Sequence, residues 1–179
     1  MAYTAIVFNS SHNLAGLRHP VDYGSGIEWS AGLLDAYPGS ALQIGLYLVN
    51  SCGHIAAGQL DMYIDKLALF LRGYSDRSIY LRIGYEFDSA ENNYAPDDYI
   101  AAFRHIVHRF DYYQVNNTAF VWHASGFEPR DGLQSRDWFP GEDYVDWCGV
   151  SLFQQPYSCQ TAKECVFLYA EVLYTELPI

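Results

Sequence analysis

A carboxylate stands directly after an apolar run in the segment 79-IYLRIGYEFDS-89. The acid is Glu86, and the aromatic residues Tyr85 and Phe87 flank it. A carboxyl group at the end of a buried strand can give a proton to a leaving oxygen and take one from water. Glu86 is therefore the first candidate for chemistry. The alternative is structural, with Glu86 paired to Arg82 or to another cation near the rim of the fold.

Aromatic and polar side chains close or follow this apolar run and the other apolar runs of the chain. They are Tyr47, Tyr85, Asp88, Trp122, His123, Phe153, Gln154 and Gln155. If these runs are parallel strands, their carboxyl ends meet at one edge of the sheet, where ligand sites form. A carboxylate, a histidine and flat aromatic faces at one edge suit a neutral, polyhydroxylated ligand such as a sugar.

Two other motifs have weaker chemical interpretations. His105 and His108 are three residues apart, as metal ligands on a helix can be, but they lie between core-facing positions and are interpreted as solvated residues. The segment 140-PGEDYVDW-147 carries three acids and is typical of a turn that leads into a strand. The sequence contains no glycine-rich phosphate loop and no G-x-S-x-G turn. We expect no metal and no cofactor, and a metal-dependent hydrolase that uses His123 and nearby acids is the weakest alternative.

The composition indicates one acidic, aromatic-rich globular domain over residues 1–179. Half of the 179 residues are hydrophobic and 17% are aromatic, which suffices for an ordinary core. The net charge is −11 with only 10 Lys and Arg residues, and this balance argues against nucleic acid because phosphates need basic patches. No apolar run approaches the roughly 18 residues of a membrane span, so we expect no membrane partner.

Cysteines and glycosylation acceptor patterns favour an exported protein. The segments that start at Asn9 and Asn116 match the acceptor pattern. Cys159 and Cys165 flank a short polar stretch and are candidates for a local disulfide, while the four cysteines lack the Cys-x-x-Cys pairs of a zinc site. The segment at Met1 has no signal-peptide pattern. We expect the full-length protein to be secreted.

Short apolar runs alternate with amphipathic helical patterns along the chain. The predicted strands are 3–8, 42–49, 79–84, 118–122 and 145–152, and the predicted helices are 27–37, 58–72, 96–110 and 161–173. This alternation is the pattern of right-handed βαβ units, and its spacing predicts an α/β fold, a partial (β/α)8 barrel. A doubly wound sheet is the alternative, but no G-x-G-x-x-G turn follows a predicted strand.

Four sequence blocks, taken together, resemble glycoside hydrolase family 26, which is best known for β-mannanases. The blocks are 79-IYLRIGYEFDS-89, 92-NNYAPDDYIAAFRHIV-107, 119-AFVWHASG-126 and 138-WFPGEDYVDWCGVSLF-153. Their order and spacing agree with the family over roughly residues 40 to 160. The most specific parts are the Arg-x-x-x-Glu strand and the Pro-Gly-x-x-Tyr-Val-Asp-Trp entry to the later strand.

The resemblance implies a (β/α)8 barrel and retaining hydrolysis of a β-linked polysaccharide, such as a mannan, by two glutamates. Glu86 matches the acid/base at the end of the family's fourth strand, so the five predicted strands would be strands two to six. The family's nucleophile ends the seventh strand, and Pro178-Ile179 is similar to the opening of that strand. We therefore expect a chain truncated at both ends, with the nucleophile beyond Ile179. The residues expected around the sugar are Tyr85, Asp88, Tyr94, Trp122 and His123.

Three positions depart from the family pattern. Many members carry His before the acid and Asn two residues after it, where this chain has Tyr85 and Asp88. Phe153, also a substrate-binding candidate, stands where a hydrogen-bonding Tyr is common.

Glu171 and Glu176 are the nearby alternatives for the nucleophile. A second hypothesis is therefore a catalytically inactive relic that binds glycan through the same cleft.

Overall fold

The computed structural model describes residues 2–7, 14–22, 26–126, 129 and 132–151. Its main sheet has five strands in the order β1-β4-β5-β6-β7, and every neighbouring pair is parallel. The strands are β1 (Ala2–Val7), β4 (Leu42–Tyr47), β5 (Ile79–Ile83), β6 (Thr118–Ala124) and β7 (Trp147–Val150). The order follows the chain without a reversal, as in the wall of a barrel, whereas a doubly wound sheet reverses at its switch point.

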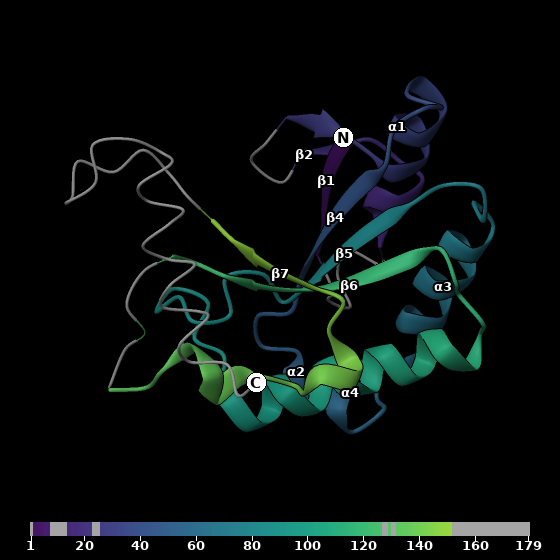
Figure 1. Ribbon diagram of the computed structural model, residues 1–179. Helices are drawn as coiled ribbons and strands as arrows, with labels where there is room; N and C mark the ends of the chain where they lie inside the picture. Colours follow the sequence, from purple (N-terminus) through teal and green to yellow (C-terminus); the bar gives the residue numbers. More distant parts are fainter. Residues whose placement is uncertain (1, 8–13, 23–25, 127–128, 130–131, 152–179) are drawn as a thin grey trace, which may run out of the picture.

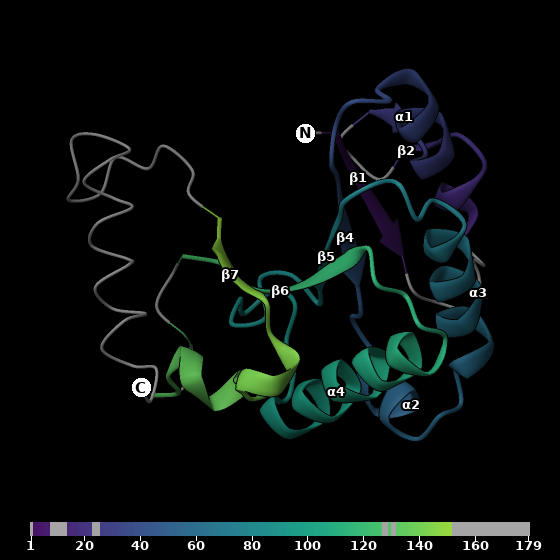
Figure 2. The same ribbon diagram turned by 45° about the vertical axis from the view of Figure 1, so that its right-hand side comes forward.

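Helices cover one face of this curved sheet, as Figures 1 and 2 show. They are α1 (Ser30–Ala36), α2 (Cys52–Ala56), α3 (Asp61–Arg72) and α4 (Pro96–Tyr112). Short elements complete the described part: the two-stranded β2 (Val21–Asp22) and β3 (Ile27–Glu28), and the 3-10 turns η1 (Ala15–Leu17), η2 (Ser135–Trp138) and η3 (Glu142–Tyr144). The predicted α/β fold, a partial barrel, is confirmed.

The local predictions differ from the structure mainly at helix starts. Ile27–Glu28 pairs with β2, so the helix predicted over 27–37 begins only at Ser30. The helix predicted from Gly58 begins at Asp61, because Gly58 has a φ of +72° and leaves the helical region. The sequence pattern also missed α2. The helix predicted over 161–173 lies outside the described residues.

Side chains along β5 alternate between the buried core and the opposite face of the sheet. Ile79, Leu81 and Ile83 are buried at 1% exposure or less and belong to one cluster with side chains of α3 and α4. Tyr80 and Arg82 alternate with them and are only half-buried. The apolar run therefore packs one face against the helices, and the polar residues of the same strand face the inside of the barrel wall.

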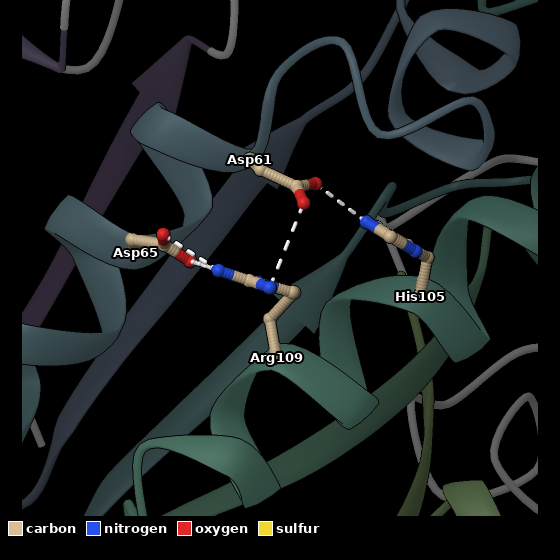
Figure 3. A network of polar contacts seen from close by, with 4 residues as sticks. All are labelled: Asp61, Asp65, His105 and Arg109. Atoms are coloured by element: carbon tan, nitrogen blue, oxygen red, sulfur yellow. Dashed lines mark hydrogen bonds and ion pairs between the residues drawn. The ribbon is translucent and has the colours of Figure 1, made fainter.

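An ion-pair network joins α3 to α4 on the helical side, as Figure 3 shows. His105 Nε2 lies 2.6 Å from Asp61 Oδ1, and Arg109 Nε donates to Asp65 Oδ1 over 2.8 Å. The histidine that the sequence suggested as a solvated residue therefore takes part in the helix contact. None of the helices in the described part of the chain is long and apolar enough to cross a membrane.

Candidate active site at the ends of the parallel strands

Glu86 lies in a tight turn directly after β5, in the left-handed backbone region with a φ of 54°. This region costs an ordinary residue about 1–2 kcal/mol, so surrounding contacts must hold it. The Glu86 N–H donates to the His123 carbonyl over 2.7 Å. Asn92 Nδ2 donates to the carbonyls of Tyr85 and Glu86 over 3.1 and 3.0 Å. Strain held in this way is typical of functional sites.

Asn92 is a contributor that the sequence reasoning missed. It is only 8% exposed, and its amide satisfies two carbonyls that the turn removes from the sheet. An asparagine six residues after Glu86 was visible in the sequence, but nothing in its spacing showed that its side chain folds back on the turn.

The Glu86 carboxyl group is half-buried and receives a hydrogen bond from a later strand. Ser151 Oγ donates to Glu86 Oε1 over 2.6 Å. Ser151 directly follows β7, two strands away from β5 in the sheet. The carboxyl is thus fixed at the carboxyl ends of the strands, where barrels place their chemistry.

His123 is the last residue but one of β6, next to this turn, and is 5% exposed. Its Nε2 lies 3.2 Å from Arg82 Nη1. Since a guanidinium only donates, Nε2 must accept and the imidazole proton sits on Nδ1. Burial, and then the charge of Arg82, lower the pKa of His123 from 6.5 to about 3, so the ring is neutral at physiological pH.

Two glycines make room for this pair. Gly149 is paired with His123 in register, and a Cβ on it would lie 2.6 Å from the His123 ring. Gly45 is paired with Arg82, and a Cβ there would meet the guanidinium at 3.1 Å. Arg82 on β5 and His123 on β6 can therefore lie side by side because the outer neighbours, β4 and β7, carry glycine at the paired positions.

The low pKa of His123 predicts a pH-dependent stability. The unfolded imidazole binds a proton below its ordinary pKa of 6.5, but the folded one does so only near 3. The free energy of unfolding should therefore fall as the pH drops from 6.5 towards 3, by up to about 1.4 kcal/mol per pH unit from this residue. We expect His123→Asn to lose about 2 kcal/mol of that dependence between pH 7 and pH 5.

Denaturant unfolding at pH 7 and pH 5 measures this difference. His19→Asn, at an exposed position, is the matched control and should follow the parent protein. If the parent and His123→Asn proteins showed parallel pH curves, the neutral assignment of His123 would be wrong.

Tyr85 is half-buried beside Glu86 and contacts an aromatic ring and a cation. Its ring centroid lies 5.9 Å from that of Tyr47, at the end of β4, and the Arg82 guanidinium lies 5.0 Å from the Tyr85 ring centroid. The structure thus brings together Tyr85, Glu86 and His123 from two strand ends. A flat aromatic face beside a carboxyl group is a suitable surface for a sugar ring.

Asp88 lies below the surface and holds two loops together. It is 3% exposed, its Oδ1 accepts the Ser125 N–H over 2.6 Å, and its Oδ2 accepts from Ser135 Oγ at 3.5 Å. Burial raises the pKa of Asp88 above its ordinary value. These contacts give Asp88 a positioning role, and a direct contact with substrate stays a prediction.

Tyr94 and Trp122 lie in the packed layer beneath the turn, at 3% and 1% exposure. The Tyr94 hydroxyl accepts the Leu48 N–H over 3.1 Å. Trp122 stacks on Phe87 with 4.5 Å between ring centroids, and its Nε1 donates to the Trp138 carbonyl. Both side chains support the site from below, and their contact with a sugar also stays a prediction. Phe153 and the expected nucleophile lie outside the described residues.

Comparison with known proteins identifies the family. The model of glycosyl hydrolase family 26 matches residues 47–178, which include β5, β6 and β7. The chain belongs to this family.

Two curated relatives of this family 26 chain are named as β-1,3-xylanases. One from a Vibrio species is 36% identical over 148 residues, and one from an Alcaligenes species is 34% identical over the same length. Each alignment covers 82% of this chain but only 32% and 31% of the relative. The chain thus spans about a third of the length of the curated relatives that it matches.

Solved structures of family 26 proteins share the fold of the chain. GH26C from Muricauda has a TM-score of 0.57 at 16% identity, with 80% of this chain and 47% of that one covered. A GH26 β-mannanase from Bacteroides ovatus has a TM-score of 0.63 at 12% identity, with 96% and 56% covered. At such identities the likeness concerns the fold alone.

The described residues of this family 26 chain contain no group of three or more His, Cys, Asp or Glu side chains that would hold a metal ion. The expected absence of a cofactor stays a prediction. His108, the other histidine singled out in the sequence, lies 3.4 Å from the hydroxyl of Tyr144 through its Nε2.

Proposed function

We propose that the whole protein to which these residues belong is a retaining glycoside hydrolase that cleaves a β-linked polysaccharide, with Glu86 as acid/base. The observation that carries this proposal is the Glu86 carboxyl group, held at the carboxyl end of β5 by its strained turn and by Ser151. Membership of family 26 supports the same reaction class. β-1,3-Xylan is the first substrate to test, because both curated relatives are named as β-1,3-xylanases, and β-mannan is the second.

The proposed reaction has two steps. A second carboxylate attacks the anomeric carbon while Glu86 gives its proton to the glycosidic oxygen, so that the C–O bond breaks and a glycosyl-enzyme ester forms. Water then attacks the same carbon, Glu86 takes a proton from it, and the ester bond breaks with release of the nucleophilic carboxylate. The proton that Glu86 lost is restored, and the sugar keeps its β configuration.

The surrounding residues are proposed to serve substrate binding in two ways. Tyr85, which is half-buried beside Glu86, offers a ring face to a sugar, and the neutral His123 offers polar contact. Asp88, Tyr94 and Trp122 lie deeper and would shape the cleft through the loops that they hold. Because polysaccharides of this kind are too large to enter a cell, we also propose that the whole protein acts after secretion.

Product analysis tests this proposal directly. Incubation of the whole natural protein with β-1,3-xylan and with β-1,4-mannan should release oligosaccharides from one of them. Proton NMR of the first product should show the β anomer before mutarotation. Release of the α anomer would exclude the retaining mechanism.

Two further outcomes would replace the proposal. Oligosaccharide binding without turnover of either polymer would favour the inactive glycan-binding relic. Loss of activity on addition of a chelator would favour the metal-dependent alternative, whereas we expect a chelator to have no effect.

A further inference from the structure

Ser151 is a residue of the site that no sequence motif singled out. Its N–H donates to the Ala124 carbonyl over 3.0 Å, which extends the pairing of β7 with β6 by one residue. Its Oγ reaches Glu86 Oε1 over 2.6 Å, although the two residues are 65 positions apart in the chain. The hydroxyl therefore extends from a backbone that the sheet holds in place.

Hydrogen bonds also fix the position of Glu86, the other partner in this contact. The Glu86 backbone is held by the His123 carbonyl and by the Asn92 amide, as described above. Gly126, with a φ of +76°, lies beside the Ser151 backbone, and a Cβ added to it would lie only 2.5 Å from the Ser151 carbonyl oxygen. A larger residue at position 126 would therefore collide with the Ser151 backbone.

A serine hydroxyl suits a group that must exist in two protonation states. It donates to an ionised carboxylate, and after rotation about its C–O bond it accepts from a carboxylic acid. We infer that Ser151 is a positioning residue that keeps the Glu86 carboxyl in one orientation through both steps of the reaction. This inference rests on the proposed function, because it assigns Ser151 to the acid/base of that reaction.

The test compares Ser151→Ala with Ser151→Thr in the whole natural protein. We expect Ser151→Ala to lower kcat/KM on the polysaccharide about tenfold or more. Ser151→Thr keeps a hydroxyl and should restore the parent value. Ser78→Ala, at an exposed position before the amino end of β5, is the control and should match the parent.

A second substrate separates positioning from general damage. In a dinitrophenyl oligosaccharide, the dinitrophenolate leaves without needing a proton. Formation of the glycosyl-enzyme from this substrate should therefore be nearly unaffected by Ser151→Ala. Equal losses on both substrates would overturn the inference. If Glu86→Gln in the same panel retained activity on the polysaccharide, the proposed function would fail. If Glu86→Gln were inactive and Ser151→Ala behaved as the parent, only the role of Ser151 would fail.

Discussion

Glu86→Gln should lower kcat/KM on the polysaccharide by about 10²- to 10⁴-fold, the usual contribution of a general acid/base. The amide has the shape of the carboxyl group and its oxygen still accepts from Ser151 Oγ, which lies 2.6 Å from the Glu86 carboxyl. It cannot give or take the proton. The change should therefore remove chemistry and leave the fold and the binding of oligosaccharide intact.

Initial rates on the polysaccharide and on a dinitrophenyl oligosaccharide measure this effect. The activated substrate should still form the glycosyl-enzyme, and azide, which attacks without a base, should release a β-glycosyl azide from it. Glu91→Gln is the matched control, because Glu91 is an exposed acid in the same loop. Unchanged hydrolysis by Glu86→Gln would remove Glu86 from the mechanism.

Gly84→Ala should destabilise the protein by about 2–5 kcal/mol. Gly84 has a φ of +54°, where a side chain costs about 1–2 kcal/mol. An added Cβ would also lie 2.7 Å from Tyr99 Cε2 and 3.3 Å from Leu48 Cδ1, and such overpacking costs about 1–3 kcal/mol. Tyr99 has little freedom to move, since it is fully buried and its hydroxyl donates to the Ile83 carbonyl over 2.9 Å.

Two other glycines separate the cost of the backbone conformation from the cost of overpacking. Gly132 has a φ of +72°, and no atom of the described residues lies within 4 Å of an added Cβ, so Gly132→Ala should show the backbone cost alone. Gly39 has no positive φ and, in the described part of the chain, no close neighbour, so Gly39→Ala should be neutral or stabilising by less than about 1 kcal/mol. Denaturant midpoints give all three values. A Gly84→Ala cost equal to that of Gly132→Ala would mean that α4 shifts to accept the methyl group.

The sequence by itself determined the alternation of strands and helices and the place of the acid. The apolar run 79–84 and the helical pattern over 96–110 are local, so their periodicity predicts them without knowledge of the fold. Because the carboxyl ends of parallel strands meet at one edge, Glu86 and His123 could also be placed together. Tyr85 followed from its position next to the acid.

Only the tertiary structure decided which of these side chains are buried below the strand ends and what holds them. The run 118–122 is apolar at almost every position, so its pattern cannot show which face is buried or that Trp122 lies in the core. The contact of Asp88 with sugar stays a prediction, and only the structure shows that its carboxylate accepts the Ser125 N–H from the loop after β6. The bond from Ser151 to Glu86 spans three strands of the sheet. Such contacts depend on strand register, which is a property of the packed sheet and leaves no mark in the spacing of residues along the chain.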